Sequence, residues 1–280
     1  MTDIGKINTL TVKKKVDAGA LLDGGAAGDI LLPQKYVSRR CKPGDKVAAF
    51  IYIDREKRLM ATIKKPAATV GQVAWLQVVA TSAVGAYLAW GLEHDLFVPS
   101  GEQRVPMEKG EFHAVFLFLD ERTNRVTASS ELNQFLGLRS PEYDAGAVVD
   151  LFICEQTALG YKAVVDNAHW GFIYKNEVFQ ALLPGQQLKG YIKLIRPDLK
   201  IDIRLQQSGT QGLDTIANSI LETITNHGGR LAVSDKSPPD EIYTLFGVSK
   251  KRFKKAIGAL YKRNLIILDD SGIRLSKKSG

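Results

Sequence analysis

The amino-acid sequence predicts a multidomain protein, with three small all-β barrels in tandem followed by an α+β domain of three helices and a hairpin. Two observations predict this fold class. One order of short strands and turns recurs three times between residues 5 and 205, and the hydrophobic period then changes from two residues to about three and a half. A chain of 280 residues also exceeds what one small core usually occupies.

The first repeat, residues 5–63, reads as short strands separated by turn residues. Its opening strand alternates polar and apolar side chains, and a polar hairpin tip at 54–57 separates the last two strands. The predicted strands are 5–12, 19–23, 29–33, 43–53 and 58–63. Five strands in this length are enough to close a small barrel.

The same order of strands returns twice. Gly71, Asp95 and Gly110 each lie 66 residues after an equivalent residue of the first repeat, which indicates a repeated unit. The strands of the second repeat are predicted at 71–78, 85–90, 95–99, 110–119 and 125–129. Those of the more diverged third repeat are predicted at 146–153, 160–165, 170–174, 184–195 and 200–205. Linker chemistry between the repeats gives expected domain boundaries of 1–66, 67–140, 141–208 and 209–280.

Five strands with a longer excursion between the third and the fourth are the layout of an OB-fold, which binds oligonucleotides on its second and third strands by stacking bases on aromatic rings. The first repeat has leucine and isoleucine there and is predicted to lack a stacking platform. An aromatic residue in a strand can equally pack the barrel core, because alternate side chains point inward. The candidate nucleic-acid-binding residues of the other two repeats are Tyr87, Trp90, Phe97, Tyr161, Lys162, Phe172 and Tyr174.

The C-terminal domain begins with a helical stripe from Leu213 to Ile224, which ends at the glycines of 227–229. A short strand is predicted at 230–233, and a second helix is predicted to start at Ser237 as its cap, with proline in the first turn. A third helix and the strands 265–268 and 273–275 complete a winged helix, with the hairpin turning at 269–272.

The third helix, residues 249–263, is basic and amphipathic, with Ser249 as its cap. One side is predicted to be apolar and to consist of Phe253, Ala256, Ile257, Leu260 and Tyr261. Gly258, beside the lysines, is compatible with close approach of another backbone. Lysine-rich helices are often no more than solvated surface, but residues 212–280 carry twelve Lys and Arg against seven Asp and Glu. The candidate phosphate-binding residues are Lys251, Arg252, Lys254, Lys255, Lys262 and Arg263.

Composition favours an anionic partner. The sequence pI is about 9.3, which points first to nucleic acid and second to an anionic membrane surface. No signal peptide and no apolar run of about 18 residues is seen, so we expect a cytoplasmic protein without membrane insertion. Cys41 and Cys154 are far apart and belong to no Cys-x-x-Cys pair, so neither a metal nor another cofactor is expected.

Residues 235–242 and 249–262 together resemble the C-terminal signature of the conserved virulence factor B family of bacterial S1-type RNA-binding regulators. The resemblance extends over nearly the whole chain. It implies S1-like repeats that bind RNA, a winged helix that assists, and a role in controlling gene expression. In the S1 pattern a glycine and an aromatic residue open the second strand, as in Gly85-Ala-Tyr87 and Gly160-Tyr161, and Gly171-Phe172 fits the third. The first repeat departs from this pattern at both places.

Together these observations favour a non-enzymatic regulator that binds single-stranded RNA. A DNA-binding transcription regulator acting through the winged helix is the main alternative, although lysines read base edges less well than Asn, Gln or Arg. A nuclease is disfavoured, because the acidic pairs Asp120–Glu121 and Asp269–Asp270 fall at predicted turns and no metal-binding or P-loop motif occurs. Association with the ribosome or with the transcription or translation machinery stays open.

Overall fold

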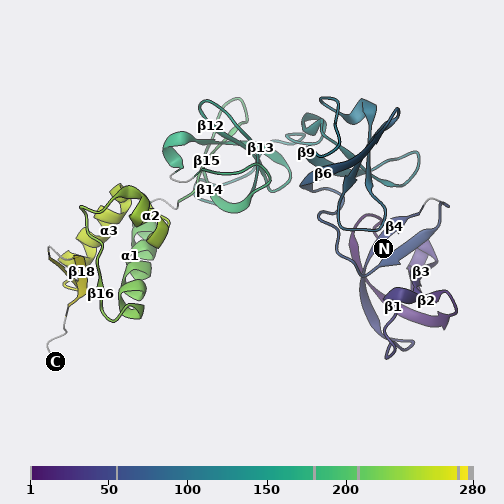
Figure 1. The fold of residues 1–280 in the computed structure, drawn as a ribbon, viewed down its shortest axis with the longest axis horizontal. Coiled ribbons are helices and arrows are strands. Elements are labelled where there is room, and N and C mark those ends of the chain that lie inside the picture. The colour runs from purple at the N-terminus through teal and green to yellow at the C-terminus, as the bar shows by residue number, and fades with distance from the viewer. Residues whose placement is uncertain (1, 55, 179–180, 207–208, 270–271, 277–280) are drawn as a thin grey trace. The chain divides into compact units, whose positions relative to one another are not determined.

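The computed structural model describes residues 2–54, 56–178, 181–206, 209–269 and 272–276. Three closed barrels of five strands precede a domain of helices and a three-stranded sheet, which confirms the predicted fold class (Figure 1). The chain divides into two compact units, Met1–Leu138 with the first two barrels and Arg139–Gly280 with the third barrel and the helical domain. The finer boundaries between the four predicted domains stay predictions.

The three barrels share one topology. In the first, β1 (Ile7–Val16), β2 (Gly19–Asp23), β3 (Asp29–Pro33), β4 (Lys46–Ile53) and β5 (Leu59–Thr62) follow the order β1-β2-β3-β5-β4, and β1 closes the barrel on β4. The strand β1 is longer than predicted because a bulge between Val12 and Lys14 bends it. Its first half can then pair with β4 and its second half with β2.

The other two barrels repeat this order. The second consists of β6 (Val73–Ser82), β7 (Gly85–Ala89), β8 (Leu96–Pro99), β9 (Phe112–Leu119) and β10 (Val126–Ser129). The third consists of β11 (Val148–Gln156), β12 (Gly160–Val165), β13 (His169–Tyr174), β14 (Gln187–Ile195) and β15 (Ile201–Arg204). In each barrel a short 3-10 helix follows the third strand: η2 (Gln34–Tyr36), η3 (Ser100–Glu102) and η5 (Lys175–Glu177).

A glycine opens the second strand of every barrel for a steric reason. A Cβ atom on Gly19, Gly85 or Gly160 would lie 1.9, 2.2 or 2.1 Å from a carbonyl oxygen of the third strand. Real Cβ atoms do not approach that closely, so only glycine permits this pairing. The repeated glycine therefore marks the start of the strand pair on which an OB-fold binds its ligand.

The first two barrels pack against each other within the first unit. Phe50 of β4 belongs to the apolar core of the second barrel and meets the edge of the Trp90 ring at 5.6 Å between centroids. Arg125 donates from Nη2 to the carbonyl oxygen of Asp54 at 2.8 Å. The Glu93 carboxylate accepts from Lys35 Nζ and, at 2.9 Å, from the Tyr36 hydroxyl. These contacts fix the joint between the two barrels.

Acid is expected to loosen this joint. The hydrogen bond from Lys35, followed by that from Tyr36, lowers the pKa of Glu93 from 4.5 to about 2. A carboxylate with a lowered folded-state pKa stabilises the protein above its unfolded pKa, and this contribution is lost as the pH falls from 4.5 through 2. Calorimetry at pH 5 and pH 2 should therefore show a larger fall in melting temperature for the wild type than for Glu93→Gln. Equal falls in melting temperature for the two proteins would contradict a stabilising role of the Glu93 carboxylate at this joint.

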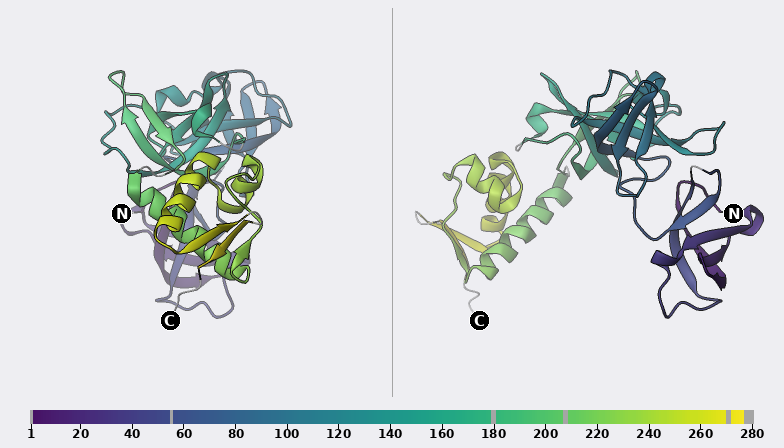
Figure 2. Two further views of the ribbon diagram at one scale, coloured as in Figure 1. Left: turned by 90° about the vertical axis from the view of Figure 1, so that its left-hand side faces the viewer. Right: turned by 45° about the vertical axis from the view of Figure 1, so that its right-hand side comes forward.

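The C-terminal domain is a winged helix. Its elements are α1 (Gly209–Asn226), β16 (Arg230–Leu231), α2 (Pro239–Phe246), α3 (Lys250–Lys262), β17 (Ile266–Asp269) and β18 (Gly272–Leu275), with sheet order β16-β18-β17 (Figure 2). The core brings together Ile220, Ile224, Ile242, Phe253 and Ile273, which are fully buried. None of the helices within the described residues is long and apolar enough to cross a membrane.

Two details of the predicted helices are wrong. Ser237 does not cap α2: Pro238 holds the cap position, and the Ser237 hydroxyl accepts from the Ser234 N–H at 3.1 Å. Tyr261 does not join the buried side of α3, since it is 54% exposed. The cap of α3 is confirmed, because Ser249 Oγ accepts from the Arg252 N–H at 3.3 Å. The centre of the predicted hairpin turn, 270–271, lies outside the described residues.

Candidate nucleic-acid interface

Strand register allows the ligand face of the three barrels to be compared position by position. Residues paired directly across neighbouring strands lie on the same face of a sheet. We call the three residues in register on the first, second and third strands of each barrel the outer row. The outer rows are Lys14–Leu21–Leu31, Ala80–Tyr87–Phe97 and Glu155–Lys162–Phe172. The face is therefore aliphatic in the first barrel, aromatic in the second, and mixed charged and aromatic in the third.

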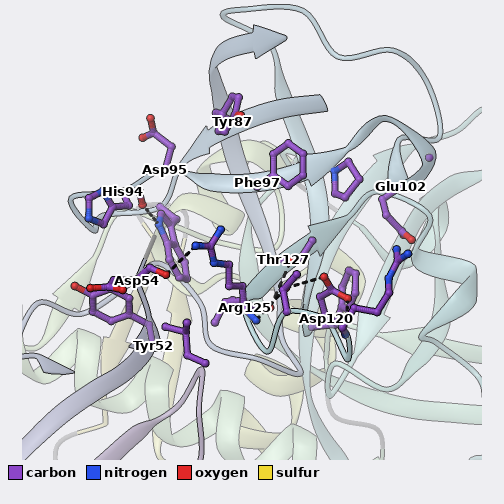
Figure 3. A pocket seen from close by; sticks show the side chains of 18 residues that line it. Tyr52, Asp54, Tyr87, His94, Asp95, Phe97, Glu102, Asp120, Arg125 and Thr127 are labelled. Atoms are coloured by element: carbon purple, nitrogen blue, oxygen red, sulfur yellow. Dashed lines mark hydrogen bonds between the residues drawn. The ribbon is translucent and has the colours of Figure 1, made fainter. Parts of the chain in front are cut away.

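In the second barrel the outer row opens into a cleft. The half-buried rings of Tyr87 and Phe97 lie 5.2 Å apart and are tilted by 41°. They line a cleft of about 880 Å³ that the β4–β5 hairpin of the first barrel also borders (Figure 3). The cleft further contains Tyr52, Phe118 and two arginines, Arg122 and Arg125. Flat rings beside cations are what an OB-fold needs to stack a base and hold its strand.

Trp90 lines this cleft but cannot serve as a stacking platform, contrary to the prediction. Its side chain is only 6% exposed, and its indole N–H donates to the carbonyl oxygen of His94 at 2.6 Å. Its ring packs on Phe50 of the first barrel. The residue is part of the joint between the two barrels, because burial and the hydrogen bond together fix its orientation.

In the third barrel two predicted aromatic residues lie on the outer face of β13. Phe172 and Tyr174 are half-buried and meet edge to face at 5.0 Å. Lys162 lies opposite Phe172 on β12 and places Nζ 3.7 Å from the centroid of the Trp170 ring. Such cation–π packing holds the ammonium group over a ring at the surface. This face therefore combines aromatic rings with a positioned cation.

Tyr161 is a core residue, and its predicted role in base stacking is wrong. It is 5% exposed, and its hydroxyl accepts from the Leu182 N–H at 3.4 Å. The residue directly after the opening glycine points into the barrel, and the second residue after it points out. Tyr87 follows Gly85 by two positions, whereas Tyr161 follows Gly160 by one. The glycine–aromatic pattern alone does not separate the two faces.

The six cations predicted to bind phosphate on α3 and at its C-cap divide into two groups. Lys251, Lys255 and Lys262 are exposed, and none of them pairs with an acid among the described residues. Of the others, Lys254 lies 3.5 Å from Asp235 and Arg263 lies 3.0 Å from Asp214. Arg252 is half-buried and donates to Gln206 Oε1 at 3.3 Å. The first three are therefore the residues of this helix best suited to phosphates.

Two further features of α3 bear on ligand binding. The space beside Gly258 is open, since no atom lies within 4 Å of the position that a Cβ would take. Tyr261 presents an exposed ring next to Lys262, a feature missed when it was assigned to the apolar side. An exposed tyrosine among lysines can pack on a sugar or a base. The helix thus offers both charge and a ring.

The largest net positive charge of any predicted domain lies in the first barrel, and the sequence analysis did not identify it. Residues 1–66 contain fourteen Lys and Arg against seven Asp and Glu, whereas residues 67–140 contain five against eight. Counting charge repeat by repeat would have found it. Nine of these cations are exposed and form no ion pair with any described residue. Five of the nine lie in two short stretches of the sequence: Lys14, Lys15, Arg39, Arg40 and Lys42. We call these five the first-barrel cations.

Comparison with known proteins gives matches at both ends and along the whole chain. The CvfB-like winged helix domain matches residues 218–275, and the S1 domain matches residues 4–64. YitL of Bacillus subtilis is 27% identical over 98% of this chain and 94% of its own length. Conserved virulence factor B of Staphylococcus epidermidis is 25% identical over 98% and 95%. A solved multidomain protein with nucleic acid binding domains from Streptococcus pneumoniae is 23% identical, covers 97% of this chain and 98% of its own, and has a TM-score of 0.39.

Proposed function

We propose that this chain is a cytoplasmic RNA-binding regulator of gene expression. It matches the CvfB-like winged helix domain and the S1 domain. It also matches proteins named conserved virulence factor B along nearly its full length, as the resemblance in its sequence predicted. Its ligand is single-stranded RNA. The barrels stack unpaired bases, and the winged helix and the first barrel hold phosphates. The regulation acts after transcription, on the RNA itself, and the proposal includes no catalytic step.

The observation that carries the proposal is the Tyr87–Phe97 pair in its open cleft. Rings on the ligand face of an OB-fold stack only on bases that are free of a duplex, so they favour single strands. Cations outside the cleft, on α3 and in the first barrel, suit the sugar-phosphate strand that runs on from a stacked base. This arrangement of rings and cations would also suit single-stranded DNA. The 2′-hydroxyl group of RNA is what distinguishes the two nucleic acids.

Replacing Phe97 by alanine is expected to weaken binding of single-stranded RNA about 5- to 150-fold, because one stacked base contributes about 1–3 kcal/mol. Fluorescence anisotropy with a labelled single-stranded RNA measures the change. Phe112→Ala is the matched control, since Phe112 is 49% exposed on β9 of the same barrel and does not line the cleft. Equal losses for the two variants would contradict a binding role for the cleft.

A DNA-binding regulator acting through α3 is the second candidate. The open space at Gly258 and the exposed lysines around it would allow that helix to approach a duplex. Competition between unlabelled single-stranded RNA and duplex DNA for the labelled RNA separates the two functions. Displacement by RNA at much lower concentration supports our proposal, and preferential displacement by the duplex would overturn it.

A further inference from the structure

The Glu102 carboxylate differs from the other carboxylates at the cleft of the second barrel in its hydrogen bonding. Glu102 ends η3 directly after β8 and borders the cleft with Tyr87 and Phe97 (Figure 3). Its Oε2 atom is buried and has no hydrogen-bond partner among the described residues. A buried acceptor without a donor is costly, and native structures seldom keep one unless it has a task.

The equivalent position of the third barrel shows what is missing. Glu177 ends η5 there, and its carboxylate accepts from Lys193 of β14 at 2.9 Å. The strands β9 and β14 can be aligned by their register. Val73 pairs with Phe116 in the second barrel, and the equivalent Val148 pairs with Tyr191 in the third. Two residues beyond Phe116, β9 carries Phe118. Two residues beyond Tyr191, β14 carries Lys193, at a shift in its pairing with β15 that β9 and β10 lack. The second barrel thus has the carboxylate at the end of its 3-10 helix, and Phe118 is a ring that lines the cleft.

The backbone of Glu102 is held in place. Its carbonyl oxygen accepts from the Ser130 N–H at 2.9 Å and from the hydroxyls of Ser129 and Ser130 at 3.3 Å each. These bonds fix the main chain from which the carboxylate projects. Other carboxylates at the cleft are either satisfied or solvated. Asp54 accepts from Arg58, Asp120 accepts from Thr123, and Asp95 is exposed.

The chemistry of the cleft selects one class of base. The rings favour a flat aromatic ligand, and the carboxylate favours two adjacent N–H donors. Among the bases of RNA, guanine carries N1–H and the N2 amino group side by side, whereas uracil flanks its single N–H with two carbonyl oxygens that repel a carboxylate. Adenine and cytosine each place an amino group beside an acceptor nitrogen.

We propose that the cleft of the second barrel is a guanine-preferring pocket for one unpaired nucleotide. The base stacks on Tyr87 and Phe97, and the Glu102 carboxylate accepts from guanine N1–H and N2–H. This inference rests on the proposed function, since it names the base that the RNA-binding cleft reads. It makes the second barrel a source of sequence preference, while the cations elsewhere bind any sequence.

The test compares labelled oligouridylates that differ only at a central position, which is guanine, inosine or uracil. With the full-length chain, the guanine oligonucleotide is expected to bind about 5- to 150-fold tighter than the uracil one, the range of a good bidentate contact. Inosine lacks the N2 amino group and should fall between them. Glu102→Gln should bring the guanine and uracil affinities within about twofold of each other. Glu121→Gln, an exposed residue at the β9–β10 turn, removes the same charge and should leave the preference intact.

Each outcome distinguishes the pocket from the proposed function. Tight binding of all three oligonucleotides with equal affinity overturns the guanine pocket and leaves RNA binding standing. An unchanged preference in Glu102→Gln, with a wild-type melting temperature, also overturns it. No binding of any oligonucleotide would overturn the proposed function, and the pocket with it. The inosine comparison needs only the wild-type protein, so the test does not depend on how well the variant folds.

Discussion

Replacing Phe253 by alanine is expected to lower the free energy of unfolding of the winged helix domain by about 3–5 kcal/mol. The Phe253 side chain is fully buried in the core of that domain. Its ring stacks on Phe246 of α2 with centroids 5.1 Å apart and ring planes at 24°. The substitution leaves a cavity where α2, α3 and the sheet meet. A domain of this size has about 4–10 kcal/mol of stability in total, so the loss is a large part of it.

Two spectroscopic signals can separate this loss from the behaviour of the barrels. All three tryptophans, Trp75, Trp90 and Trp170, lie in the barrels, whereas the α-helices of the described chain all lie in the C-terminal domain. Circular dichroism at 222 nm should therefore melt earlier in Phe253→Ala while tryptophan fluorescence melts as in the wild type. Tyr261→Ala, on the exposed side of the same helix, should change the free energy of unfolding measured by either signal by no more than about 0.5 kcal/mol. A variant in which both signals shift together would show that the winged helix and the barrels unfold as one.

The strand order was predictable because each repeat obeys the same local rules. Alternation marks the strands, polar turns separate them, and the opening glycines stand where a side chain would strike a carbonyl oxygen. Boundaries were less predictable where a tertiary feature decides them. The second half of β1, for example, depends on the bulge that bends it toward β2.

The facing of individual side chains was harder to predict. A shift of one residue turns a strand side chain from one face to the other, and this separates Tyr161 from Tyr87. Trp90 lies just beyond β7, and its burial depends on Phe50 of another barrel. On α3, Tyr261 lies about 80° around the helix from Phe253, while the buried residues lie within about 60°. The buried stripe is simply narrower than the apolar pattern.

The candidate site shows the same limit. The aromatic character of the second barrel's ligand face could be inferred from Tyr87 and Phe97, and the charge of the first barrel could have been counted. Glu102 could not have been singled out. Its missing partner becomes apparent only in comparison with Glu177 of the third barrel, whose carboxylate accepts from Lys193. Local patterns predict elements, whereas the chemistry of a site depends on pairings between distant segments.

When the first-barrel cations are neutralised, the fall in RNA affinity between about 50 and 200 mM salt is expected to become about a hundredfold smaller. The variant replaces all five residues with glutamine. Each phosphate contact to a single strand adds about 0.7 to the slope of log K against log salt, so five contacts add about 3.5. Between about 50 and 200 mM salt, a slope of that size corresponds to roughly a hundredfold change in affinity. Anisotropy titrations at several salt concentrations measure the slope directly.

The matched control removes five charges that already have acidic partners: Lys13, Arg58, Lys189, Lys200 and Arg274. Both variants lower the net charge by the same amount. If general attraction to a basic protein were responsible, the two slopes would fall equally, because only net charge would matter. If individual cations contact phosphates, the slope falls mainly in the first variant, since a cation held by a carboxylate is less available to the strand. Equal slopes would therefore contradict a phosphate-binding role for the first barrel even if RNA binding itself is strong.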